Sequence, residues 1–151
     1  MDTTTLALTA FTTIPTIPSI QQTISHIYST IQKIRSHQYA NIVHNHIIDL
    51  DVETPIQSIE MFIQKESFCH SEITTLCTKR IHQSIDKIHK LLEEIEEKLN
   101  AYQKSWMVWL RGINTFYILE ELKKEKQILE GRIDTLMQLL MIQSLTKLHK
   151  S

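Results

Sequence analysis

The sequence predicts an all-α fold, an antiparallel helical bundle of about four long helices plus one short helix, with an apolar segment at its N-terminus. Two observations lead to this fold class. The 151 residues include only two glycines and three prolines, too few for the tight turns of a many-stranded sheet. Isoleucine and leucine also recur every three or four residues over long stretches, which is the spacing of one apolar helix face.

The first helix is expected to begin at Ser19. Ser19 and Gln22 form a capping-box pattern, and Pro18 lies just before them, where it stops any earlier helix from continuing. An isoleucine seam follows and continues, with a shift near Gln38, as far as Leu50. We therefore expect one helix over residues 19–50.

The N-terminal segment is unusual because residues 3–32 contain no Asp, Glu, Lys or Arg. It is not a plain transmembrane span, since it is rich in Thr and Ser and is interrupted by Pro15 and Pro18. Residues 4–13 are compatible with a short apolar helix or an extended segment. We divide the chain into an apolar Thr/Ile-rich segment, 1–18, and a helical bundle domain, 19–151.

A short second helix is predicted after residue 54. Thr54 is expected as its N-cap, Pro55 at its first helical position and Gln57 as the capping-box partner. We expect this helix to end near Phe68, and the next one to begin at Ser71.

The next helix has the most regular pattern in the chain, a four-three alternation of apolar residues that continues as far as Trp109. Gly112 then supplies a turn, and a fourth helix follows, whose apolar tail extends to the C-terminus. The predicted core seam of these two helices is Ile81, Ile85, Ile88, Leu92, Ile95, Leu99, Leu122, Leu129, Ile133, Leu136 and Leu140.

Short connections favour helices that fold back on their neighbours, so we expect a compact antiparallel bundle. The alternative is an extended parallel coiled-coil oligomer. The compact bundle is favoured because several apolar faces are wider than a strict two-position seam.

Composition argues against several functions. The net charge of −1 gives no global basic field, so nucleic-acid binding is not expected. The sequence has no glycine-rich phosphate loop, and its acidic residues are strung along helix faces and not gathered in one place, so we expect no enzyme and no cofactor. Two cysteines are too few for a secreted disulfide framework.

A metal site is not expected either. His44 and His46 are two residues apart, which points them in different directions on a helix. A second group lacks the usual metal-ligand spacings; it consists of Cys69, His70, Cys77 and His82.

The segment from Lys104 to Arg111 is apolar nearly all round, because it contains Trp106 and Trp109 beside Met107, Val108 and Leu110. Such a segment is typical of a buried bundle end. It is also compatible with an aromatic patch that contacts lipid or another subunit.

Residues 92–143 carry a further pattern. A long helix ends in a segment rich in Lys and Trp near Lys104 and Trp106, and after a short corner a leucine-spaced helix runs through Leu140. This stretch resembles the four-helix N-terminal domain of mixed-lineage kinase domain-like proteins, part of the broader HeLo group. The charge-poor N-terminus also resembles that group, its fungal members in particular.

The resemblance implies a bundle that oligomerises and perturbs membranes in a cell-death or immune-type response. The membrane-insertion candidates would be Leu6, Leu8, Phe11, Ile14 and Ile17. The candidates for contact with lipid or a partner would be Lys79, Arg80, Lys87, Lys90, Trp106 and Trp109. The implied partners are further copies of the chain and anionic membrane lipids, and the implied location is the cytoplasm, with recruitment to a membrane.

The alternative hypothesis is a structural or adaptor bundle, of host or viral origin, that uses its long apolar seams to bind a helical protein partner or itself. It predicts soluble complexes of fixed stoichiometry. Membrane perturbation predicts a dependence on lipid.

Overall fold

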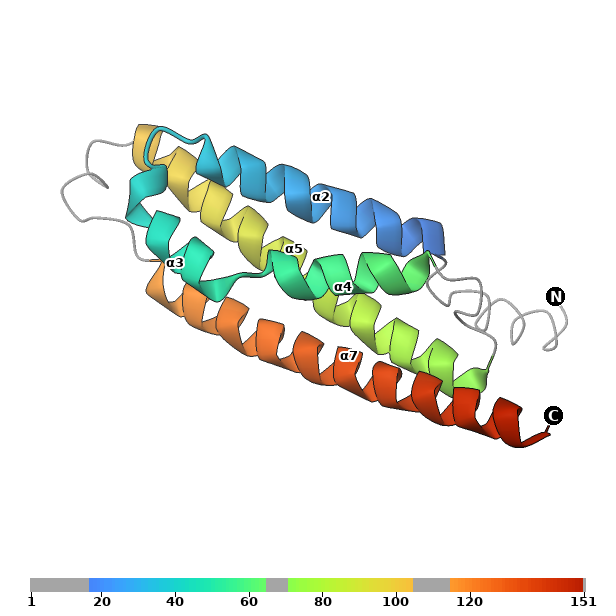
Figure 1. Ribbon diagram of the computed structural model, residues 1–151. Helices are drawn as coiled ribbons and strands as arrows, with labels where there is room; N and C mark the ends of the chain where they lie inside the picture. The colour runs from blue at the N-terminus through green and yellow to red at the C-terminus, as the bar shows by residue number, and fades with distance from the viewer. Residues whose placement is uncertain (1–16, 65–70, 105–114, 151) are drawn as a thin grey trace, which may run out of the picture.

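The computed structural model describes residues 17–64, 71–104 and 115–150 (Figure 1). These residues contain no strand, which confirms the all-α prediction for this part of the chain. The helices are α2 (Ile17–Arg35), the 3₁₀ helix η1 (Ala40–Ile42), α3 (His44–Leu50), α4 (Glu53–Ile63), α5 (Glu72–Lys104) and α7 (Phe116–Lys150).

The prediction of one helix over residues 19–50 is wrong, because α2 begins at Ile17, includes Pro18 and ends at Arg35. Ser36 donates its hydroxyl proton to the carbonyl oxygen of Gln32 (2.9 Å), and the His37 ring accepts from the backbone N–H of Tyr39 (3.1 Å). Such local bonds between side chain and backbone compete with the helical ladder. Helical structure resumes only with η1 and α3.

The short helix also differs from its prediction. Val52, not Thr54, precedes its first residue, and the Thr54 hydroxyl donates to a carboxylate oxygen of Asp51 (2.6 Å). Asp51 has a left-handed backbone (φ 46°), a conformation that commonly ends a helix and here ends α3. α4 itself ends at Ile63, five residues before the predicted end.

The beginning of α5 agrees with the sequence. The hydroxyl oxygen of Ser71 accepts a hydrogen bond from the backbone N–H of Thr74 (3.1 Å), which is the bond that an N-cap side chain makes. α5 then runs without a break to Lys104.

Hydrogen bonds between α5 and α7 show that these two helices run in opposite directions. Near the middle of α7, the Arg132 guanidinium donates to the carbonyl oxygen of Arg80 and to the Ser84 hydroxyl, both at 2.6 Å. Farther along α7, Gln143 donates to the Ser71 hydroxyl at the start of α5 (2.9 Å).

α2 and α5, by contrast, run in the same direction. Thr23 lies within 3.4 Å of Asp86, and His37 lies 3.0 Å from Asn100, so positions rise together along the two helices. The two helices share one direction because the chain returns through α3 and α4 between them (Figure 1).

The core lies between α2, α5 and α7, with α3 and α4 closing one side. All predicted seam residues of α5 are buried, as are Leu122, Leu129, Ile133 and Leu136 of α7. Leu140 is half-buried and packs at the edge of this core. α2 contributes five buried isoleucines to this core: Ile20, Ile24, Ile27, Ile31 and Ile34.

We predict that Leu92→Ala lowers the free energy of unfolding by about 2–5 kcal/mol, because truncation of the fully buried side chain leaves a cavity beside α2 and α3. Urea unfolding followed by circular dichroism measures the loss. Gln83→Ala, at an exposed position of the same helix, is the control and should change the free energy by less than about 0.5 kcal/mol. Equal losses in the two variants would contradict the assigned core.

Candidate functional site

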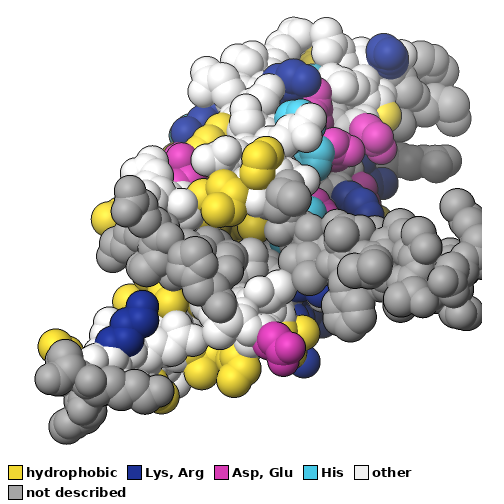
Figure 2. Space-filling model, turned by 90° about the vertical axis from the view of Figure 1, so that its right-hand side faces the viewer, with side chains coloured by type: hydrophobic (Ala, Val, Ile, Leu, Met, Phe, Trp, Pro, Cys, Tyr) yellow, Lys and Arg dark blue, Asp and Glu magenta, His cyan; other side chains and the backbone are white. Residues whose placement is uncertain are grey.

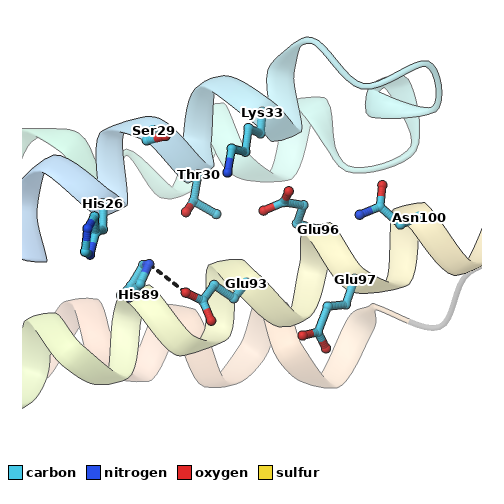
Figure 3. Close-up of a pocket in the computed structure, with 9 residues that line it drawn as sticks. All are labelled: His26, Ser29, Thr30, Lys33, His89, Glu93, Glu96, Glu97 and Asn100. Atoms are coloured by element: carbon cyan, nitrogen blue, oxygen red, sulfur yellow. Dashed lines mark ion pairs between the residues drawn. The ribbon is translucent and has the colours of Figure 1, made fainter.

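A polar groove with a volume of about 380 Å³ lies between α2 and α5 (Figure 3). α2 contributes His26, Ser29, Thr30 and Lys33, and α5 contributes His89, Glu93, Glu96, Glu97 and Asn100. The groove exists because the buried seams of the two helices lie beneath it and their polar flanks face each other above.

Two histidines face each other across this groove. The ring centroids of His26 and His89 are 5.5 Å apart, with the ring planes inclined by 31°. The Nε2 atom of His89 lies 2.9 Å from a carboxylate oxygen of Glu93, one turn farther along α5. In Figure 3, Lys33 from α2 and Glu96 from α5 point into the space between the helices.

These groups are typical of a solvated helix flank. The Glu93 side chain is about half exposed, and its contact with His89 is an i,i+4 pair of the kind found on helix surfaces. Within the described residues, no group of three or more His, Cys, Asp or Glu side chains is placed to hold a metal ion. His44 and His46 are both exposed, and Cys69 and His70 lie outside the described residues.

A second polar contact joins α2 to α4. The Tyr28 hydroxyl donates a hydrogen bond to a carboxylate oxygen of Glu60. Burial, followed by this hydrogen bond and the negative charges of Glu60 and Glu53, raises the pKa of the Tyr28 phenol above its usual value. The contact is structural, since it fixes α4 against α2.

The four basic contact candidates are all exposed on α5. With a rotation of about 100° per residue, Lys79, Arg80, Lys87 and Lys90 share roughly 100° of the helix circumference. Ile73 and Leu76, which are also exposed, lie on the same side of the preceding turns. The structure therefore brings the predicted basic residues together on one surface.

Most other membrane candidates lie outside the described residues: Leu6, Leu8, Phe11, Ile14, Trp106 and Trp109. Ile17 is described, and it begins α2 and packs half-buried against the core. None of the described helices is both long and apolar enough to cross a bilayer.

One feature was not identified from the sequence as a site. Of the thirteen large apolar side chains that are exposed in the described residues, seven lie at one end of the molecule. We call this the apolar end; it comprises Ile73 and Leu76 at the start of α5, and Met137, Met141, Ile142, Leu145 and Leu148 of α7.

The two parts of the apolar end are held together by the hydrogen bond from Gln143 to Ser71. Figure 2 views the molecule from this side and shows hydrophobic side chains on its surface. The sequence pattern that indicates this surface is the tail of α7, where apolar residues occupy nearly every side of the helix. A single neighbouring helix cannot bury an apolar surface that wide.

The chain is distantly similar to a viral protein. An uncharacterized protein of Acanthamoeba polyphaga mimivirus is 27% identical over 88 residues, which span 57% of this chain and 43% of the relative. The chain thus covers less than half of that relative's length. No family model and no solved structure matches the chain.

We predict that Tyr28→Phe lowers the free energy of unfolding at neutral pH by roughly 1–2 kcal/mol, because Glu60 loses its hydrogen-bond donor. Tyr117→Phe, at an exposed tyrosine, is the control.

The same contact predicts a pH dependence. The folded-state pKa of Tyr28 is raised, so its contribution is complete below the unfolded-state pKa of about 10 and is lost as pH rises through the folded-state pKa. Between about pH 9 and about pH 11, the wild type should lose stability more steeply than Tyr28→Phe. Parallel curves in urea unfolding at each pH would contradict the assignment.

Proposed function

We propose that this chain is a non-enzymatic helical assembly module that joins its own copies or a helical protein partner through the apolar end. The observation that carries this proposal is the concentration of exposed apolar side chains on α7 and the start of α5, whereas the apolar seams elsewhere in α2, α4 and α5 are buried. Exposed apolar surface gathered in one place marks interaction sites on folded proteins.

We propose that the described helices form one up-down-up-down bundle, in which α3 and α4 together are the second member. A bundle of this kind supplies a rigid body, and the longest helix, α7, presents its last turns at one end. The polar groove between α2 and α5 supports no enzymatic function, because its carboxylates and histidines flank an open, solvated surface.

The similarity to a mimivirus protein favours a viral form of this assembly function. A structural or adaptor bundle needs a packed core and an exposed apolar surface, and both are present in the described residues.

A second candidate is membrane perturbation in a cell-death or immune-type response, the function implied by the HeLo resemblance. It is favoured by the basic surface of Lys79, Arg80, Lys87 and Lys90 beside exposed Ile73 and Leu76. Basic residues next to apolar ones suit the interface of an anionic membrane, where each cation contributes about 1 kcal/mol. The protein would act from the cytoplasm.

The assembly function predicts a soluble complex of fixed stoichiometry without lipid. Size exclusion with light scattering should give a mass that is a whole multiple of the 17.7 kDa chain, unchanged by anionic liposomes. A chain that stays at 17.7 kDa at every concentration, with no helical protein partner recovered from its source, would contradict the proposal.

The membrane function predicts leakage from anionic liposomes that is lost when residues 1–18 are deleted. Lys87→Gln with Lys90→Gln should weaken liposome binding by roughly tenfold or more, whereas the matched exposed pair Lys123→Gln with Lys124→Gln on α7 should have a smaller effect. Leakage that is absent from the full-length chain, or equal with and without residues 1–18, would eliminate this candidate.

A further inference from the structure

We infer that the partner at the apolar end is a second copy of this chain, bound through the last turns of α7 in a two-fold, antiparallel contact. The inference rests on the proposed assembly function and names its partner and its surface.

The contact surface is a stripe along α7, which we call the tail stripe: Met137, Met141, Leu145 and Leu148. Their side chains are 47%, 65%, 54% and 72% exposed. The spacings of four, four and three residues place them within about 80° of the helix circumference. This is the pattern of a face that packs against one other helix.

The tail stripe is distinct from the face that α7 packs into the core. Ile133 and Leu136 are buried, and Leu140 packs half-buried at the edge of the core. The centre of the tail stripe lies roughly 110° around α7 from the centre of that face. The same turns of one helix thus carry two apolar faces, and the core of this chain covers only one of them.

The tail stripe of one copy can pack against the tail stripe of a second copy that runs in the opposite direction. In an antiparallel pair centred between residues 142 and 143, Met137 of one copy lies opposite Leu148 of the other, and Met141 lies opposite Ser144, one residue from Leu145. Each such contact occurs twice, which is the property of a two-fold interface between identical chains.

The fold leaves room for this pairing. The last turns of α7 and the first turn of α5 extend beyond the ends of α2 and α4 (Figure 1). Residues 137–148 span about 16 Å, and an antiparallel partner would place its own bundle at the opposite end of the contact. Met137 also lines a surface groove of about 330 Å³ between α4 and α7, beside Pro55 and Ser58, where the tail of the second copy can enter.

Charge favours a copy of the chain over a charged partner. Residues 137–148 contain one charged side chain, Lys147, so two tails do not repel each other and offer little to an anionic headgroup or an acidic protein. The two methionines are flexible and polarizable, which suits a face that must pack against itself.

The first test is a concentration series of the full-length chain by sedimentation equilibrium. The wild type should dimerise, and Met141→Glu should raise the dimer dissociation constant by about tenfold or more, because it places a charge in the apolar contact of both copies. Thr146→Glu, exposed on the same turns but outside the tail stripe, is the matched control and should leave the constant nearly unchanged. Circular dichroism checks that both variants keep their helix content.

The second test determines the direction of the pairing. In a background of Cys69→Ser and Cys77→Ser, Met137→Cys and Leu148→Cys are prepared as separate variants and mixed under mild oxidation. The antiparallel contact predicts a disulfide between Met137→Cys and Leu148→Cys chains, and little between identical chains, because a disulfide needs Cα atoms within about 7 Å. Disulfides formed mainly between identical chains would overturn the antiparallel contact.

Three outcomes would overturn the inference, and each leads elsewhere. An oligomer that Met141→Glu leaves intact would place the interface elsewhere, while the assembly function stands. A full-length monomer that dimerises only after residues 1–16 are deleted would show that this chain's own N-terminus covers the tail stripe. A monomer that Met141→Glu releases from anionic vesicles would assign the stripe to lipid and would count against the assembly function itself.

Discussion

The structure depends on one constraint, the continuous burial of one face of α5. Its seam from Ile81 to Leu99 is fully or almost fully buried, and both α2 and α7 pack on it. A seam with alternating spacings of four and three keeps one face toward its neighbours over many turns, because its average period is close to that of the helix. The other long helices take their positions from this one, which explains why α2 and α7 need so few polar contacts with it.

The polar contacts between helices set direction and register along that seam. Arg132 reaches over to the backbone of Arg80 and the hydroxyl of Ser84, and Tyr28 ties α4 to α2 through Glu60. Few of these contacts are fully buried, so each contributes modestly to stability, on the order of 1 kcal/mol. Their main effect is to select one arrangement among the many that apolar packing alone would allow.

The burial of apolar side chains changes along α7. Its first two thirds follow the α5 seam, whereas its last turns keep large apolar side chains on the surface. Leaving such side chains in water forgoes a gain of roughly 1.5–3 kcal/mol each, which a second surface can recover. The proposed assembly function rests on these exposed apolar side chains and not on a cluster of reactive groups. The tail stripe is apolar and the basic surface of α5 is charged, so the first is tested by self-association and the second by binding to liposomes.

The sequence by itself determined the helical class, the α5 seam and the Ser71 cap, because each depends on spacing or on bonds between near neighbours in the chain. The break after Arg35 and the early start of α4 also involve local bonds, those of Ser36, His37 and Asp51, but the apolar spacing used for the prediction does not report them. The tertiary structure decided the rest. The parallel course of α2 and α5, the exposure of the basic side of α5 and the exposure of Met141 and Leu145 depend on which helix covers which face. That choice is made by packing between residues far apart in the chain, so no local pattern could have supplied it.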